Sequence, residues 1–265
     1  MQAIWRGAIN FGLISIPVRL YSATEEKSLR FNMLHAEDMG RIRFNRTCSE
    51  CGKDNLTKDD IVRAYEYEKG QYVTFSDEDL AAVEAETSHT VEVVNFTPSE
   101  QIDPVYYQRS YYLAPEELGI RAYGLLRKAL TESDRVAVAK VAIRDKERLA
   151  TLRVRDNVLV LETMYWPDEI RDPAFPEIDQ KTEVREQELQ MANTLIENLT
   201  EDFRPEEFRD TYREALLAAV EAKVEGREIV APAIPEDQAP VVDLMDALQA
   251  SVEAVKSRKQ KASGE

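Results

Sequence analysis

Residues 136–165 read VAVAKVAIRDKERLATLRVRDNVLVLETMY, and this stretch decides the fold class. Its apolar residues come in three short runs, Val136–Ile143, Leu149–Val154 and Val158–Tyr165. Turn-forming residues such as Asp156 and Asn157 separate the runs. Short apolar runs between turns are typical of neighbouring antiparallel strands, so the stretch predicts a β-meander.

The chain before the meander adds further strands and one helix. A helix is expected over residues 116–130, after Pro115. Extended runs bounded by glycine, proline or polar residues predict strands at 4–9, 17–21, 30–35, 41–45, 91–96 and 106–113. The core is therefore expected to be mainly β.

Beyond the meander the hydrophobic spacing changes to that of amphipathic helices, starting at Glu183. The second of these helices is expected to begin at Pro205 and end at Gly226. Residues 229–240 are rich in proline and predict a linker. A last apolar helix is expected over 241–255, followed by a basic run; isolated behind a linker, it predicts a docking peptide or a flexible tail.

The composition places the chain among soluble proteins of a reducing compartment. The 265 residues are 43% hydrophobic, enough for one large domain or two small ones with a core. No run approaches the roughly 20 apolar residues of a membrane helix, and the first residues lack the basic segment and cleavage site of a signal peptide. Two cysteines three positions apart cannot staple a fold of this size, so a cytoplasmic protein is expected.

The net charge of −16 is unevenly distributed along the chain. Residues 1–58 carry a net charge of +3 and residues 135–155 a net charge of +5. The acid is concentrated in residues 59–134, with net −10, and 156–240, with net −14. Such asymmetry is typical of a nucleic-acid interface, although basic residues that protect strand edges would produce it as well.

Within the two basic stretches the charges alternate with apolar residues. In residues 41–45 an extended chain would place Arg41, Arg43 and Asn45 on one face, and Ile42 and Phe44 on the core face. In residues 150–155 the same alternation sends Arg153 and Arg155 outward. These two arginines have no acidic neighbour on that face within their own strand, so local neutralisation is not expected.

Catalytic motifs are absent from the sequence. It holds no phosphate-binding glycine loop and no nucleophile elbow, and its two histidines, His35 and His89, are expected to be ordinary structural or surface residues. Asp59-Asp60 and Asp77-Glu78-Asp79 could hold Mg²⁺ in a metal-dependent DNA-processing enzyme. However, Ser76 followed by three acids predicts a helix N-terminus. No enzymatic activity is therefore expected, and the DNA-processing enzyme remains an alternative.

Cys48-x-x-Cys51-Gly52 is half of a zinc ribbon. Tetrahedral zinc requires two more ligands, and the chain has no second such pair. The same pair from a second subunit could complete the site; an unmetallated turn or a disulfide are the other possibilities. A zinc-ribbon interaction protein that binds no DNA is therefore a further alternative.

Several strings in one order resemble prokaryotic Ku proteins. The match runs from the first residues to about Gly226. The first strings are Ala3-Ile4-Trp5-x-Gly7-x-Ile9-x-Phe11-Gly12-Leu13-x-x-Ile16-Pro17-Val18 with Leu20-Tyr21-Ser22-Ala23-Thr24, and Gly40-Arg41-Ile42-Arg43 before the cysteine pair. The later strings are Tyr65-Glu66 with Gly70-Gln71-Tyr72-Val73, Asp103-Pro104 with Arg109-Ser110-Tyr111-Tyr112-Leu113, and Tyr165-Trp166-Pro167-Asp168-Glu169-Ile170-Arg171-Asp172-Pro173.

The resemblance implies a β-barrel core with bridge strands, residues 1–182, in a homodimeric ring that double-stranded DNA enters from a free end. Residues 183–228 would be the helical arm that embraces the other protomer, 229–240 the linker, and 241–265 a short helix with a basic tail. Such proteins bind ends without sequence preference and recruit an ATP-dependent ligase of the ligase D type for non-homologous end joining, in the cytoplasm beside the nucleoid. No required cofactor is expected, with zinc at Cys48 and Cys51 as a possibility. The tail has only four basic residues, so strong DNA binding or bridging by the tail is not expected.

The expected DNA contacts come from the two basic stretches. They are Arg41, Arg43 and Arg46 from the first, and Lys140, Arg144, Lys146, Arg148, Arg153 and Arg155 from the second. The expected metal ligands, as a half-site, are Cys48 and Cys51.

Overall fold

The computed structural model describes residues 1–83, 89–143, 146–178, 183–228 and 244–262. The chain divides into two compact units, Met1–Asp172 and Pro173–Glu265. In the first unit, β7 (Val136–Ile143), β8 (Lys146–Arg155) and β9 (Val158–Met164) pair antiparallel in chain order. The predicted meander is therefore confirmed.

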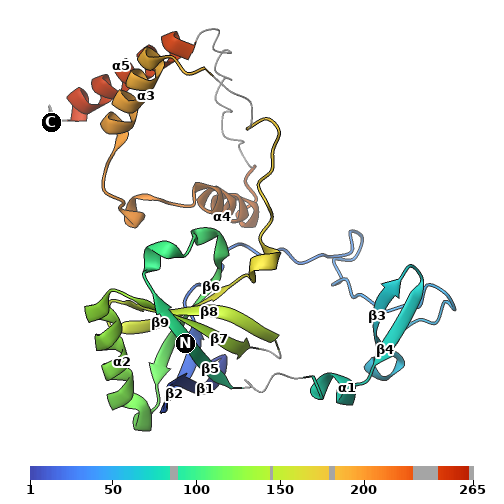
Figure 1. Cartoon of the computed structure of the whole chain (residues 1–265). Helices are drawn as coiled ribbons and strands as arrows, with labels where there is room; N and C mark the ends of the chain where they lie inside the picture. The colour runs from blue at the N-terminus through green and yellow to red at the C-terminus, as the bar shows by residue number, and fades with distance from the viewer. Residues whose placement is uncertain (84–88, 144–145, 179–182, 229–243, 263–265) are drawn as a thin grey trace. The chain divides into compact units, whose positions relative to one another are not determined.

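Four more strands complete a closed barrel with the order β1-β2-β6-β9-β8-β7-β5 (Figure 1). They are β1 (Trp5–Phe11), β2 (Ile14–Ser22), β5 (Thr90–Thr97) and β6 (Tyr107–Pro115). Every neighbouring pair is antiparallel except β1 and β5, whose parallel pairing closes the barrel. Closure pairs the strand edges of the sheet, which would otherwise invite association with other chains.

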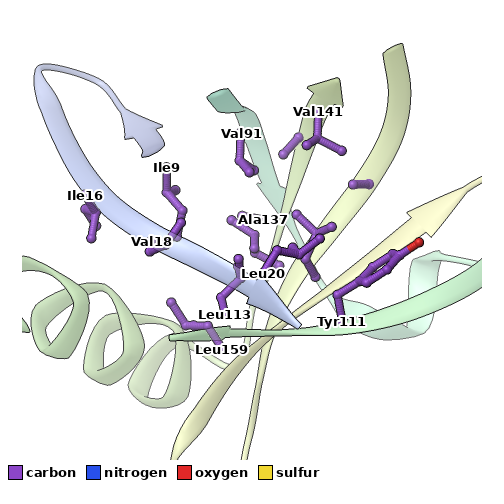
Figure 2. Close-up of a cluster of buried hydrophobic side chains, with 14 of the residues drawn as sticks. Ile9, Ile16, Val18, Leu20, Val91, Tyr111, Leu113, Ala137, Val141 and Leu159 are labelled. Carbon is purple, nitrogen blue, oxygen red and sulfur yellow. The ribbon is translucent and has the colours of Figure 1, made fainter. Parts of the chain in front are cut away.

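The interior of the barrel is filled by aliphatic side chains at alternate strand positions (Figure 2). Leu20, Leu113 and Leu159 are fully buried there. Helix α2 (Ile120–Ser133) adds an apolar stripe that includes Tyr123 to the same core. Burial of each large aliphatic side chain contributes roughly 1.5–3 kcal/mol, so the barrel is a stable base for the segments attached to it.

The segment between β2 and β5 has little regular structure. It contains α1 (Asp77–Ala81) and a two-stranded hairpin, β3 (Arg63–Glu68) with β4 (Gln71–Phe75), in which every residue is exposed. The strands predicted at 30–35 and 41–45 are wrong, since only one isolated bridge joins Leu34 to Arg41.

The expected core positions in this segment are also wrong. Ile42 is 44% and Phe44 80% exposed. A period of two buries one face only where a second layer covers it, and no other described part of the first unit does so here.

The second unit consists of helices. These are α3 (Glu186–Leu199), α4 (Thr211–Val224) and α5 (Leu244–Ala262). Helix α4 begins later than predicted, because Pro205 starts only a short 3-10 turn and Asp210 caps the helix by accepting from the Arg213 N–H at 2.9 Å. The predicted end is confirmed: Gly226 follows α4 with φ of +72°.

The sequence predicted an isolated last helix, but helix α5 is not isolated. It continues through the basic run and packs against α3, burying Val252. The expected linker, 229–240, lies outside the described residues. In the described ranges, none of the helices has the length and apolar character needed to cross a bilayer. Short 3-10 helices occur at Lys58–Asp60, Ser99–Gln101, Pro104–Tyr106, Glu117–Gly119, Pro167–Glu169 and Pro205–Glu207.

Candidate nucleic-acid interface

One end of the barrel carries the long segment between β2 and β5. Strand β2 ends at Ser22, which pairs with Tyr111 at the centre of β6. Because β2 is antiparallel to β1, this end of β2 lies beside the start of β1, and β5 runs parallel to β1. Strand β5 begins at Thr90, and its neighbour Val91 pairs with Val141 near the end of β7. The strand pairing therefore brings both ends of residues 23–89 to the same end of the barrel. We call residues 23–89 the insertion and this end the insertion end.

The second basic stretch does not form one patch. Strand β8 runs from Lys146 at the insertion end to Arg155 at the opposite end. Nine residue steps in a strand span roughly 30 Å. Lys146 and Arg148 thus lie by the insertion, whereas Arg153 and Arg155 lie toward the other end. Arg144, also expected here, falls outside the described residues.

Arg153 is neutralised by a neighbour that its own strand does not supply. Its Nε and Nη2 each donate to the Glu162 carboxylate of β9 at 2.7 Å, and the side chain of Glu162 is only 11% exposed. The expectation that Arg153 is not neutralised locally is therefore wrong, because the carboxylate comes from the neighbouring strand. Arg153 points outward as predicted, but Glu162 lies diagonally across the β8–β9 hairpin on the same face.

The pair shifts the pKa of both groups. Burial raises the pKa of Glu162, but the hydrogen bonds and positive charge of Arg153, with a hydrogen bond from Ser110, outweigh it and lower the pKa overall. The same hydrogen bonds raise the pKa of Arg153. Both groups are charged at neutral pH, and together they form a closed ion pair in the barrel wall.

Two other expected cations have carboxylate neighbours. Lys140 lies 3.1 Å from Glu147 and 5.7 Å from the ring centroid of Trp166. Arg155 lies 3.9 Å from Asp156, a contact between exposed groups that is worth little in water.

Arg148 is different. It is half-buried, and Nη1 donates to Gln108 Oε1 at 3.1 Å. No carboxylate lies within ion-pair distance of it among the described residues.

Arg41, Arg43 and Arg46 of the first basic stretch lie in the insertion, and all three are exposed. Arg41 forms the bridge to Leu34, and the Arg46 carbonyl accepts from the Leu56 N–H at 3.0 Å. In the described part of the chain, Arg41, Arg43 and Arg46 form no ion pair. Their charges are available to an external anion.

Cys48 and Cys51 form a knuckle within the insertion. The Cys48 N–H donates to the Lys53 carbonyl and the Gly52 N–H to the Cys48 carbonyl, both at 3.0 Å, and Gly52 has φ of +68°. Backbone N–H groups of Cys51 and Glu50 donate to the Cys48 sulfur and lower its pKa. In the described ranges, no cluster of three or more His, Cys, Asp or Glu side chains could hold a metal. Among the described residues the knuckle offers two thiols and no further ligand, so the expected zinc half-site stays a prediction.

The acidic clusters serve local structure. Lys53 Nζ lies 2.6 Å from Asp60, and with hydrogen bonds from Thr57 it lowers the pKa of Asp60 to about 2. Asp79 accepts from the Ser76 hydroxyl and N–H, and Ser76 caps α1, which confirms the predicted helix start. Adjacent acids engaged in caps do not converge on a metal.

Sequence reasoning passed over Arg109, at the start of β6. It pairs with Thr163 of β9 at the insertion end and is exposed. It stands alone in an acidic stretch, so charge counting gave no sign of it. The feature that could have indicated Arg109 is its position at the start of a strand beside the insertion.

Comparison with known proteins identifies the family. The model of the Ku family, described as the Ku70/Ku80 beta-barrel domain, matches residues 10–191. The chain belongs to the Ku family. Among its relatives, each named "Non-homologous end joining protein Ku", that of Frankia casuarinae is 49% identical over 97% of this chain, that of Mycolicibacterium smegmatis 44% over 98%, and that of Bacillus subtilis 44% over 96%.

This Ku-family chain spans 65% of the length of the Frankia relative, 84% of the Mycolicibacterium relative and 82% of the Bacillus relative. The family match covers nearly the whole of the first unit and part of α3. The closed barrel with helices is accordingly a Ku-type fold, as the resemblance implied.

Proposed function

We propose that this protein binds ends of double-stranded DNA without sequence preference, as a homodimeric ring that the duplex enters from a terminus. It protects the ends and recruits an ATP-dependent ligase of the ligase D type for non-homologous end joining, in the cytoplasm beside the nucleoid. Its role is binding, not catalysis. A ligase is part of the proposal because end joining requires a covalent bond that a binding protein does not form.

The insertion is the observation that carries this proposal. Its hairpin, β3 with β4, buries none of its residues. A two-stranded hairpin is at best marginally stable alone in water. A long exposed segment with unpaired arginines that leaves and rejoins a rigid barrel at one end is suited to close around a polyanion. We infer that the polyanion is DNA because the relatives are named for non-homologous end joining.

A net charge of −16 does not prevent DNA binding. Affinity for duplex DNA comes mainly from displaced counterions, with log K falling by about 0.9 per log salt for each phosphate neutralised. Exposed charges more than about 8 Å away are largely screened at physiological salt. Unpaired arginines in contact with phosphates therefore outweigh acidic residues that lie farther from the duplex.

Of the nine cations expected from the sequence, Arg144 lies outside the described residues, and the other eight contribute unequally in this proposal. Arg41, Arg43, Arg46, Lys146 and Arg148 lack a carboxylate partner among the described residues and are the favoured contacts. Arg153 and Lys140 are held by carboxylates of the barrel, so their contact with DNA competes with an existing ion pair. Arg155 is exposed and remains a candidate.

Dimerisation through the second unit is supported by exposed apolar side chains. Leu189, Ile196 and Leu199 of α3 remain exposed although α5 packs on the helix. Tyr212 of α4 is exposed as well. A second copy of the chain is the occupant we propose for these faces.

We further propose that the knuckle supplies two of the four ligands of a zinc ion shared by two copies. Its backbone N–H groups already stabilise the Cys48 thiolate, and tetrahedral zinc sites built from four thiolates are common. Metal analysis of the purified protein should give one zinc per two chains, lost in Cys48→Ser. A metal-free dimer would contradict this part of the proposal.

The principal experiment compares linear with covalently closed circular DNA as competitors for a labelled linear duplex. A ring entered from a terminus predicts that only the linear competitor displaces the probe. An open basic groove would accept both competitors, and a protein without DNA binding would bind no probe. Sedimentation of the same sample should give the mass of a dimer.

A charge-removal variant tests the insertion. Arg41→Gln/Arg43→Gln/Arg46→Gln should weaken binding to linear duplex and reduce the salt slope by up to about 0.9 per lost phosphate contact. Arg121→Gln, on exposed positions of α2, is the control and should leave both unchanged. Adding Mg²⁺ to end-labelled duplex separates binding from a nuclease, since the proposal predicts protection without cleavage.

A further inference from the structure

A cavity of about 790 Å³ opens at the insertion end of the barrel. Ser22 and Thr24, where the insertion leaves β2, form part of its wall. Arg109 of β6 and Arg148 of β8 form another part, with Tyr165 just after β9. The cavity therefore lies beside the point where the insertion leaves the barrel.

The strand register explains why the two arginines meet there. Thr163 of β9 pairs with Arg109 on one side and with Ala150 on the other. Arg148 is two residues from Ala150 and so lies on the same face of β8. The two arginines therefore flank β9, on strands roughly 10 Å apart in total. Side chains of their length can reach an anion placed between them.

The cavity has an excess of positive charge. Neither Arg109 nor Arg148 has a carboxylate within ion-pair distance among residues that the structure describes, and the Arg148 side chain donates instead to the neutral Gln108. Glu26 also lines the cavity, where it accepts from the Ser28 hydroxyl. Two cations against one carboxylate leave a net positive pocket.

The donor set suits a phosphate group. A guanidinium presents a planar fork of N–H groups that matches phosphate oxygens in pairs. Tyr165 also lines the cavity, and a tyrosine hydroxyl can donate to a phosphate oxygen. Ser22 already donates to the Thr24 carbonyl at 2.7 Å, which holds the rim of the cavity in place. Part of the rim of the pocket is therefore already held in position without a ligand.

We propose that the cavity at the insertion end is a phosphate-binding pocket in which Arg109 and Arg148 together hold one phosphate group of the bound nucleic acid. This inference rests on the proposed function for its ligand. The phosphate has two possible sources, a phosphodiester of the duplex backbone or the terminal phosphate of a broken end. A recessed pocket accepts a protruding terminal group without distorting the duplex.

The test measures the affinity of the full chain for two linear duplexes that differ only in a 5′-phosphate or a 5′-hydroxyl. Arg109→Gln and Arg148→Gln should each weaken binding about tenfold and lower the salt slope by about one. Arg121→Gln removes the same charge from an exposed position on α2 and should change neither.

The two duplexes distinguish the sources of the phosphate. If the pocket takes the terminal group, the unaltered protein prefers the phosphorylated duplex and the two variants lose that preference. If it takes a backbone phosphate, the unaltered protein binds both equally and the variants weaken both. Variants that keep the affinity and salt slope of the unaltered protein overturn the pocket but leave end binding intact.

Failure of the proposed function would look different, because the unaltered protein would then bind neither duplex. Should Arg148→Gln fail to fold, Arg148→Lys keeps the charge and removes only the fork. The pocket predicts weakened binding at an unchanged melting temperature for that variant, and unweakened binding overturns it.

Discussion

Replacing Arg153 by glutamine tests whether this residue belongs to the barrel or to the DNA contact. The substitution removes two hydrogen bonds of 2.7 Å to Glu162. It leaves a carboxylate that is 11% exposed and whose remaining donor, among the residues that the structure describes, is the Ser110 hydroxyl at 3.1 Å. An uncompensated charge would then be held in the barrel wall.

The expected loss of stability is moderate. Breaking a buried ion pair from one side costs about 3–5 kcal/mol. The Arg153 side chain is 35% exposed, so water already screens part of the interaction, and about 2 kcal/mol is a fair expectation. For a unit of this size that corresponds to a fall in melting temperature of roughly 4–8 °C. The double variant Arg153→Gln/Glu162→Gln should recover about half of the loss, because no unpaired charge remains.

The pH dependence has a definite sign. The pKa of Glu162 is lower in the folded protein than in the unfolded chain. The ion pair therefore stabilises the protein above the ordinary pKa of a glutamate, about 4.3, and loses its contribution as the pH falls through the folded value. The difference in melting temperature between the unaltered protein and Arg153→Gln should shrink correspondingly in acid.

Calorimetry at neutral and acidic pH measures these differences, and duplex affinity against salt concentration is measured on the same samples. The reasoning is refuted if Arg153→Gln melts like the unaltered protein at every pH while its salt slope falls by about one. That outcome would make Arg153 a phosphate contact, as the sequence pattern first suggested.

Three further substitutions test the fold that positions the interface. Tyr123→Phe removes a hydroxyl that donates to a β6 carbonyl and accepts from a β9 N–H, both at 2.7 Å, so unfolding by urea should show a loss of about 1–3 kcal/mol. Gly7→Ala places a Cβ against the carbonyl oxygen of His89, where the insertion rejoins the barrel. Thermal melting should show that the free energy of unfolding falls by more than about 1 kcal/mol. Unchanged melting would argue against this close approach. Val252→Asp buries a charge between α5 and α3 and should increase amide exchange in α5 while leaving the barrel melting temperature unchanged.

Much of the barrel could be predicted from the sequence because its signals are local. The period of two and the turn residues determine where β7, β8 and β9 run, and Ser76 with Asp79 sets the start of α1. The pairing of Arg153 with Glu162 was also within reach. A two-residue turn at Asp156-Asn157 sets the β8–β9 register, which places both side chains on one face.

The insertion could not be predicted in the same way. Residues 41–45 have the alternation of a half-buried strand, yet Phe44 is exposed, because a strand needs a partner that the sequence does not name. The start of α4 was misjudged for a similar reason: Pro205 suits a helix start, but the Asp210 side chain supplies the cap.

By itself the sequence determined the strands of the barrel, the uneven distribution of charge and the strings of a Ku-family chain. Only the tertiary structure decided which cations are free. It joined Arg153 to a carboxylate, separated the two ends of β8, and brought Arg109 and Arg148 to one cavity from positions far apart in the chain. Periodicity depends on neighbours along the chain, whereas the neutralisation of a charge depends on whichever side chain strand pairing places next to it.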